Sequence, residues 1–372
     1  MRIGVLGGGQ LGRMLALAGV PLGLRFVFED PAAETPAQLI AEQIVGAYED
    51  QDVHHSLAER VDLVTYEFEN VPVAALYHLA EHRPVFPVPQ ALGIMQDRAK
   101  EKRLCEQLAI PVPPFRKVET LDQLRAAAAD LGFPLMLKTR YAGYDGRGQR
   151  RVDEPAALEP AFSALGGRLL LAEPVVPFAR ELSLIAVRGR DGVCAAYPLT
   201  ENHHQDGILR WSRPLTDAGA VEQQTVAETY ARRVLEHLGY VGVVTLEFFE
   251  VGGVLLVNEM APRVHNSGHW TIEGAATSQF ENHLRAGLGW PLGPTTRRGF
   301  SVMMNIIGTE PDVARILAVP GAHLHLYGKD ARPHRKLGHV TLVAETAEQL
   351  RAQELRLAAG LAASPPLAAA TA

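Results

Sequence analysis

The hydrophobic positions of the first 95 residues follow two different periods. Short apolar runs that suit β-strands cover 2–6, 25–28, 62–66 and 85–88, and a stretch with helical period covers 10–19. Strands that alternate with helices are typical of βαβ units, in which the strands of one sheet run parallel. The pattern therefore predicts an α/β, Rossmann-like N-terminal domain over residues 1–95.

The next two hundred residues mix helices and strands without that regular alternation. A helix is expected over 97–108, and the prolines of 110–114 then favour extended backbone, as at a crossing between domains. Thr120 and Gln123 form a capping-box signature for a helix that ends near Leu131. Further strands are expected over 135–137, 169–172, 182–187 and 193–197, and a long helix over 221–238. This order predicts an α+β block over 96–290.

The pattern changes again after residue 290. Short strands and loops predict a small β-rich region over 291–356. Residues 357–372 are rich in alanine and contain Pro365 and Pro366, so we expect a frayed tail there.

Composition and charge narrow the function classes. The 36 Lys and Arg residues against 42 Asp and Glu residues give a net charge of −6, without a concentrated basic block. This argues against nonspecific binding to nucleic acid or a membrane surface and favours small-molecule chemistry. Cys105 and Cys194 are too few and too far apart for a disulfide framework or a cysteine zinc site. We expect a cytoplasmic protein without a targeting segment or a membrane span.

Two carboxylates end neighbouring strand-like runs late in the chain. Glu247 follows the run 243–246, and Glu259 follows the run 254–258. Like charges held close together are costly unless a divalent cation lies between them, and carboxylate oxygens suit Mg²⁺. A half-buried hairpin whose glutamates are simply solvated is the alternative.

The geometry of that hairpin provides a test. A two-residue turn at Gly252 and Gly253 would leave the two acids on opposite faces, whereas a three-residue loop would bring them to one face. If the acids share a cation, the hairpin must have an odd loop or a bulge. The loop 260–270 then follows with Arg, two His, Asn, Ser and Trp and no regular period, which is typical of a functional loop.

A glycine motif near the N-terminus supports a different function. Gly7, Gly9 and Gly12 follow a predicted strand and open a predicted helix, and Glu29 and Asp30 end the next strand. This is the dinucleotide-binding fingerprint, which favours an NAD-dependent oxidoreductase when taken alone. Its glycines indicate only that backbone amides can approach an anion at a helix N-terminus. We keep NAD binding as a minority interpretation.

A second glycine loop occupies 141–149, directly after Lys138. Its three glycines with Asp and Arg could wrap phosphate oxygens, although a mobile hairpin tip is the usual alternative for such a loop. The segment 173–176 ends a predicted strand and could present its backbone to an adenine, and Glu181 could bind ribose hydroxyls. His204, taken singly, suits an ordinary loop histidine as well as a ligand.

Taken together, these features resemble the ATP-grasp superfamily, whose two α+β lobes clamp ATP. The whole chain resembles the 5-(carboxyamino)imidazole ribonucleotide synthetase family of purine biosynthesis. The motifs that carry this resemblance are residues 7–14, 66–72, 143–149, 204–207, 261–270, 327–329 and 332–336. Tyr141-Ala142 and Ile272-Glu273 depart from the family pattern, which affects local loop shape only. The resemblance implies a lid lobe over about 115–175.

The resemblance implies a reaction and its site residues. ATP and bicarbonate would give carboxyphosphate and ADP. The amine of 5-aminoimidazole ribonucleotide would then capture carboxyphosphate, or the carbon dioxide that it releases, and phosphate would be set free. The implied ATP-binding residues are Arg98, Lys138, Gly143, Tyr144, Asp145, Gly146, Arg147, Gly148, Gln149, Glu173, Pro174, Val175, Val176, Glu181, His204, Asn258 and Glu259. The implied ligands of Mg²⁺ or Mn²⁺ are Glu247 and Glu259.

The second substrate has its own implied residues. The ribonucleotide would be bound by Gln10, Glu67, Tyr144, Asp145, Arg147, Lys329, Arg332, Arg335 and Lys336, the last four of which would otherwise be a solvated charge run. Arg263, His265 and Asn266 are the candidate catalytic residues, for binding bicarbonate and orienting the imidazole. An ATP-grasp ligase with another acceptor and a noncatalytic nucleotide-binding module remain alternatives. The resemblance also implies a homodimer.

Overall fold

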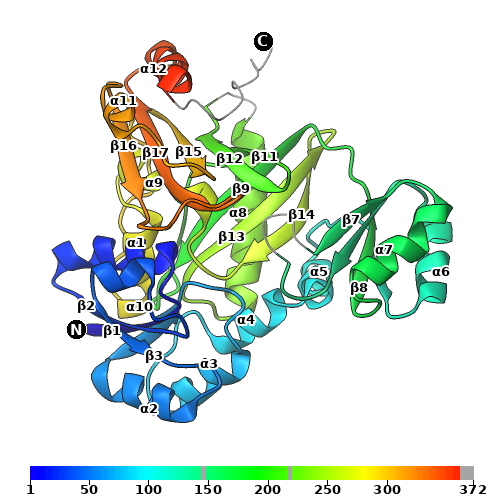
Figure 1. Ribbon diagram of the computed structural model, residues 1–372, viewed down its shortest axis with the longest axis horizontal. Coiled ribbons are helices and arrows are strands. Elements are labelled where there is room, and N and C mark those ends of the chain that lie inside the picture. Colours follow the sequence, from blue (N-terminus) through cyan, green and yellow to red (C-terminus); the bar gives the residue numbers. More distant parts are fainter. Residues whose placement is uncertain (144–147, 217–219, 361–372) are drawn as a thin grey trace.

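The computed structural model describes residues 1–143, 148–216 and 220–360, and its strands form three sheets (Figure 1). The N-terminal sheet is parallel in the order β3-β2-β1-β4. Its strands are β1 (Arg2–Leu6), β2 (Arg25–Asp30), β3 (Glu42–Val45) and β4 (Leu63–Tyr66), and its helices are α1 (Gln10–Gly19), α2 (Gln51–Arg60) and α3 (Val73–Ala80). The predicted βαβ pattern is confirmed.

The strand predicted over 85–88 is wrong. Val85 forms an isolated parallel bridge to Val64, and the chain then enters α4 (Pro89–Met95). Pro87 and Pro89 have no N–H to donate to a ladder, so this apolar run does not continue the sheet.

A small antiparallel sheet lies at one side of the molecule (right in Figure 1). Its order is β5-β8-β6-β7, with β5 (Arg116–Val118), β6 (Leu135–Thr139), β7 (Gln149–Val152) and β8 (Leu170–Pro174). Helices α6 (Leu121–Leu131) and α7 (Leu158–Ala164) pack on it through a core of their own. The predicted capping signature is present, because Thr120 Oγ1 accepts a bond from the N–H of Gln123 at 3.2 Å.

The central sheet has nine strands in the order β14-β13-β9-β11-β12-β15-β17-β16, with β10 paired to β9. The strands before residue 290 are β9 (Arg180–Arg188), β10 (Cys194–Ala196), β11 (Thr200–Gln205), β12 (Ile208–Pro214), β13 (Gly242–Val251) and β14 (Val254–Ala261). Those after it are β15 (Phe300–Ile307), β16 (Ala322–Leu326) and β17 (Lys336–Ala344). The C-terminal strands therefore extend the same sheet.

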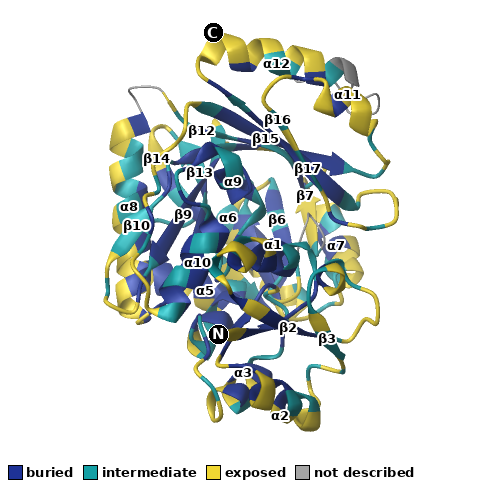
Figure 2. Ribbon diagram, turned by 90° about the vertical axis from the view of Figure 1, so that its left-hand side faces the viewer, coloured by how far each residue is buried: buried dark blue, intermediate teal, exposed yellow. Residues whose placement is uncertain are grey.

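Alternating side chains of the central sheet enter two different cores. On β13, Val244, Leu246 and Phe248 face the core shared with α5 (Arg98–Gln107) and α8 (Ala220–His237), while Val243 faces the core shared with α1 and α10 (Gln279–Leu288). Figure 2 shows that most residues of these central strands are buried. Because side chains alternate along a strand, Glu247 lies on the face of Val243.

The C-terminal tail begins later than expected. The remaining helices are α9 (Thr271–Gly274), α11 (Val313–Leu317) and α12 (Ala347–Gly360). Leu357, placed in the frayed tail by its alanine-rich surroundings, is fully buried against the core of β15 and β17. Residues 361–372 lie outside the described part. Among the described helices, none is both long and apolar enough to cross a membrane.

Candidate active site

The predicted bulge in the β13–β14 hairpin is present. A two-residue turn at Gly252 and Gly253 pairs Val251 with Val254, and the register shifts between Glu247 and Phe248. Phe248 pairs with Val257 and Glu247 pairs with Glu259, so Asn258 is the extra residue. A bulge changes the face that later side chains occupy, and it brings both acids to one face. Their hard oxygen donors fit Mg²⁺ or Mn²⁺.

Each acid also has a cationic or imidazole partner from another element. Arg98 Nη1, at the start of α5, lies 2.6 Å from Glu259 Oε2, and His265 Nε2 lies 2.9 Å from Glu247 Oε1. Burial raises the pKa of Glu259, but Arg98, with help from Lys138 and His265, outweighs burial and holds that pKa at about 2. The hairpin therefore presents an ionised carboxylate at Glu259.

Lys138 is buried beside the acid pair. Its Nζ donates to Glu173 Oε2 at 2.9 Å and to Asn258 Oδ1 at 3.1 Å. Lys102 Nζ lies 3.0 Å from the other oxygen of Glu173. Burial lowers the pKa of Lys138, and Glu173 offsets part of that effect. Burial raises the pKa of Glu173, but the two lysines outweigh it and hold the pKa at about 2.

The Glu173 side chain therefore lies in a buried cluster with two lysines rather than at the surface. Its carboxylate fixes two lysine side chains, and only its backbone and the residues after it could face an adenine. Pro174 pairs with Leu135, and the Val175 N–H donates to Pro134 O at 2.9 Å. The Val176 carbonyl accepts a bond from Phe178 N–H at 3.0 Å.

Glu181 and His204 lie side by side on β9 and β11. His204 Nδ1 and Glu181 Oε2 are 3.0 Å apart. Burial lowers the pKa of His204, but the hydrogen bond and charge of Glu181 outweigh it and raise the pKa overall. The structure thus brings a predicted ribose ligand and a predicted ATP-binding histidine into one pair.

Several side chains of the loop after Glu259 contact neighbouring elements. Arg263 forms an ion pair with Glu69, from the loop before α3, and His265 Nδ1 lies 2.9 Å from Ser267 Oγ. The amides of Asn266 and Asn305 bond to each other in both directions, at 3.0 and 2.7 Å. Trp270 is fully buried and belongs to the core rather than to a ligand surface.

The first glycine motif binds a carboxylate of the protein itself. The N–H groups of Gly9 and Gly12 donate to the two oxygens of Glu67, each at 2.9 Å. A Cβ at Gly9 would lie 2.4 Å from Glu67 Oε1. Burial raises the pKa of Glu67, and the two N–H bonds counter part of that rise. The anion site at the start of α1 is therefore filled by Glu67, a residue predicted to bind the ribonucleotide.

The acid expected to bind a dinucleotide ribose is also used internally. Glu29 is fully buried, and His54 Nε2 lies 3.3 Å from its Oε1. Asp30 Oδ2 accepts a bond from the N–H of Gly8 at 2.8 Å. Both features that favoured NAD binding are thus occupied by protein groups, and the geometry does not support that interpretation.

The four basic residues near the C-terminus that are predicted to bind the ribonucleotide have different surroundings. They are Lys329, Arg332, Arg335 and Lys336. Lys329 bonds to Gln10, which joins this segment to the first glycine loop, and its Nζ lies 5.9 Å from the Tyr327 ring centroid. Arg335 donates to the Asp330 carbonyl at 3.2 Å. Arg332 is mostly exposed, 3.8 Å from Asp330, and Lys336 begins β17. Of the residues predicted to bind the ribonucleotide, Gln10 and Lys329 are thus in direct contact.

Four site residues were not predicted from the sequence. Lys102 is the second lysine that pairs with Glu173, and Glu69 pairs with Arg263. Glu101 Oε2 accepts a hydrogen bond from Met260 N–H at 3.0 Å. Asp97 caps α5 and also bonds to Arg140 and Tyr141 at the base of the second glycine loop. The helical spacing of Arg98, Glu101 and Lys102 was the available signal, because it places them on one face. Tyr144, Asp145, Gly146 and Arg147 lie outside the described residues.

Comparisons with known proteins cover nearly the whole chain. Family models match a ribonucleotide synthetase preATP-grasp domain over residues 1–96, an ATP-grasp domain over 103–280 and a phosphoribosylaminoimidazole carboxylase C-terminal domain over 301–353. The N5-carboxyaminoimidazole ribonucleotide synthase of Pseudomonas aeruginosa is 52% identical over 92% of this chain and 94% of its own. That of Brucella melitensis is 48% identical over 92% and 96%.

Solved structures agree with this similarity. The N5-carboxyaminoimidazole ribonucleotide synthetase of Thermus thermophilus superposes with a TM-score of 0.94 at 52% identity, over 98% of this chain and 100% of that chain. The Aspergillus clavatus N5-carboxyaminoimidazole synthase, solved with ADP and 5-aminoimidazole ribonucleotide, gives a TM-score of 0.88 at 33% identity, over 97% and 98%.

Proposed function

The chain belongs to the N5-carboxyaminoimidazole ribonucleotide synthase family of ATP-grasp ligases, and from this premise we propose how its residues divide the work. The enzyme carboxylates the exocyclic amine of 5-aminoimidazole ribonucleotide in purine biosynthesis, with cleavage of ATP. The observation that best supports the site assignment is the pairing of Glu247 with Glu259 on one face, beside the buried Lys138.

The proposed reaction has two bond-forming steps. A bicarbonate oxygen attacks the γ-phosphorus of ATP, ADP leaves, and carboxyphosphate forms. The substrate amine then attacks the carbonyl carbon of carboxyphosphate, phosphate leaves and the amine loses a proton to a base that we do not assign. Because carboxyphosphate reacts readily with water, the site must close before the first step.

The acid pair would hold Mg²⁺ or Mn²⁺. Glu247 and Glu259 are the proposed ligands, with the bulged Asn258 directly before Glu259. The ion would supply positive charge to the phosphate oxygens of ATP. Without a bound ion or nucleotide, Arg98 pairs with Glu259 and the imidazole of His265 lies beside Glu247. These side chains would therefore change partners when the cation and the nucleotide enter.

The phosphates of ATP would meet cations that the protein holds in advance. Glu173 fixes Lys138 and Lys102 without neutralising both, since one carboxylate faces two ammonium groups. Preorganised charge of this kind stabilises charge that develops in a transition state. Arg98 and His204 would add to it, and Glu181 would bind the ribose. We assign Gly143, Gly148 and Gln149 to the loop that closes over the phosphates.

The second substrate would lie between the acid pair and the N-terminal domain. Arg263 and His265 lie beside Glu247, and we propose that they bind bicarbonate while Asn266 orients the imidazole. The ribonucleotide phosphate would bind near Gln10 and Lys329, with Arg335, Lys336 and the exposed Arg332 contributing charge. Glu67 would act by shaping the glycine loop that carries Gln10.

We also propose the organisation of the whole protein. Residues 1–95 form the preATP-grasp domain, 96–290 the ATP-grasp domain with a lid lobe over about 115–175, and 291–360 the C-terminal region. The family matches over 1–96, 103–280 and 301–353 support these divisions. We propose a cytoplasmic homodimer, and sedimentation equilibrium would test the dimer.

Substrate omission tests the function directly. ADP release is measured with ATP, Mg²⁺, bicarbonate and 5-aminoimidazole ribonucleotide, and ¹³C-bicarbonate is followed into the product by NMR. We expect ADP release and label transfer to depend together on the ribonucleotide. ADP release that ignores omission of the ribonucleotide would refute the acceptor assignment, and label transfer to another amine would support a different ATP-grasp ligase.

A further inference from the structure

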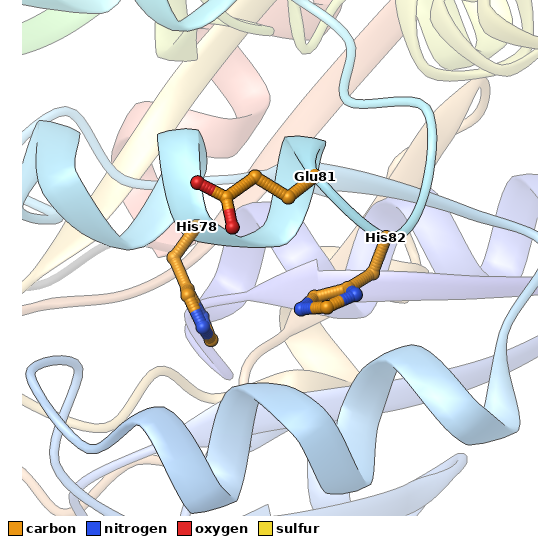
Figure 3. Close-up of side chains that lie close together, drawn as sticks. All are labelled: His78, Glu81 and His82. Carbon is orange, nitrogen blue, oxygen red and sulfur yellow. The ribbon is translucent and has the colours of Figure 1, made fainter.

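A second cluster of metal-ligating side chains lies at the end of α3, outside the candidate active site. His78 is in the last turn of α3, Glu81 is its C-cap residue and His82 follows in the next turn. One ligand atom from each of the three lies within 4.8 Å of the other two. Figure 3 shows the Glu81 side chain running back toward His78, while both imidazoles extend to the same side of the helix.

The donor types define which ion this cluster would accept. Two imidazole nitrogens and one carboxylate oxygen form the ligand set of open zinc sites, and imidazole suits Zn²⁺, Cu²⁺ and Ni²⁺ better than Mg²⁺. Glu247 and Glu259, by contrast, offer only oxygen. The two places therefore differ in the class of ion that they favour.

One ring nitrogen of His78, the buried Nδ1, lacks a hydrogen-bond partner among the described residues. A buried polar atom without a partner is unusual, and a bound ion or water would account for it. The cluster also lies at the C-terminus of α3, where the helix dipole favours positive charge.

Helix α2 brings more histidines to the same place. The ring centroid of His55 is 5.8 Å from that of His82, and the ring centroid of His54 is 5.4 Å from that of His78. His55 Nε2 also lies 3.2 Å from Glu59 Oε1. Imidazoles that gather this closely repel one another when protonated, and a metal ion holds them in the neutral, electron-donating form.

We propose that His78, Glu81 and His82 form a binding site for a transition-metal dication of the zinc class, with water completing its coordination. The bound ion would tie the last turn of α3 to the chain that follows it and would stabilise the N-terminal domain. This site is separate from the proposed magnesium site and does not depend on the reaction that the enzyme catalyses.

The test is titration of the metal-stripped full chain with ZnCl₂ by calorimetry, in a large excess of MgCl₂ that favours Mg²⁺ at the acid pair. We expect one zinc site per chain, and we expect His82→Ala to weaken it by at least about tenfold, since a direct ligand is lost. His82 is exposed, so this variant should fold like the wild type. Glu81→Gln should also weaken binding.

His237→Ala is the matched control, because His237 is an exposed histidine at the end of α8. It should bind zinc like the wild type, and zinc should raise the melting temperature of the wild type and of this control but not of His82→Ala. Melting without zinc and circular dichroism check that each variant folds. Zinc binding of equal affinity in His82→Ala and the wild type would overturn the proposal, as would an equal loss in His237→Ala.

Discussion

Glu247 and Glu259 are direct neighbours across the β13–β14 ladder, but their carboxylates are bound by side chains from different parts of the chain. Glu259 meets Arg98 of α5, and Glu247 meets His265 of the following loop. The bulge at Asn258 creates the acid pair, and side chains from α5 and from the loop after β14 contact its two carboxylates. In the proposed function, a metal ion and a nucleotide would therefore enter by exchanging partners, without refolding the hairpin.

Replacing Glu259 tests the function of this pair. Glu259→Gln removes one proposed metal ligand and weakens the contact with Arg98, so turnover should fall by about a hundredfold, equivalent to roughly 3 kcal/mol of lost transition-state stabilisation. The free energy of unfolding should fall by only about 1–2 kcal/mol, because glutamine can still accept a bond from Arg98. ADP release and urea unfolding measure the two effects.

Glu250→Gln is the matched control for that variant. Glu250 lies on the same hairpin and forms a 2.6 Å ion pair with Arg180, but it is not part of the proposed metal site. It should lose a similar amount of stability and retain turnover. If both variants lose activity equally, hairpin stability rather than a metal ligand explains the defect.

Glu67 should be a structural residue of the first glycine loop. Glu67→Ala leaves the N–H groups of Gly9 and Gly12 without their acceptor, so we expect unfolding in urea to show a loss of about 3 kcal/mol. Asp30→Ala removes one bond, to Gly8, and should cost less. The wild type should also show no saturable NAD binding by calorimetry, because the carboxylate already occupies the anion position; a stoichiometric NAD complex would contradict this account.

Lys102 should control the position of Lys138 through Glu173. Lys102→Met leaves Glu173 with one ammonium partner, and breaking a buried ion pair should cost about 3 kcal/mol of stability and raise the KM for ATP. Lys100→Met, an exposed neighbour on α5, should change neither quantity. A double-mutant cycle with Glu173→Gln should show a coupling energy, whereas additive effects would indicate that the two residues act independently.

Glu101 should make stability fall with rising pH. Burial, with help from the charge of Glu259, raises its pKa to about 8. The folded protein therefore holds a proton that the unfolded chain releases near pH 4.5, and stability falls between about pH 4.5 and 8, by an amount of order 5 kcal/mol. Urea unfolding from pH 5 to 9 should show this fall in the wild type.

Glu101→Gln imitates the protonated acid and should remove that contribution, so its stability relative to the wild type should increase with pH. Glu106→Gln changes an exposed acid of the same helix and serves as the control. Parallel stability curves for Glu101→Gln and the wild type would show that Glu101 ionises normally.

The sequence predicted those helices that are determined by residues close together in the chain. The helices α1, α5, α6 and α8 were predicted to within about two residues, because their caps and apolar period are local. The bulge at Asn258 followed from the requirement that two acids share a face. The strand prediction for 85–88 was wrong because it rested on the apolar residues alone. Pro87 and Pro89 lack the N–H groups that a strand needs.

The contacts of buried charged side chains could not be predicted from neighbouring residues in the sequence. The sequence does not show that Glu67 turns back to Gly9, that Glu29 meets His54, or that Lys102 and Lys138 share Glu173, since these contacts depend on how whole elements pack. A local motif such as the first glycine loop indicates an anion site, but only the packed structure shows which anion fills it. Leu357 shows the same limit, because its burial depends on distant strands β15 and β17.

The continuity of the nine-stranded sheet also has a consequence for biosynthesis. Strand β12 pairs with β11 on one side and with β15 on the other, and β15 is translated only after α10 is complete. The growing polypeptide therefore leaves the ribosome with an open strand edge at β12, which is the type of surface that recruits other chains into aggregates. Expression truncated before β15 should yield insoluble protein even though every residue proposed to bind ATP has already been made.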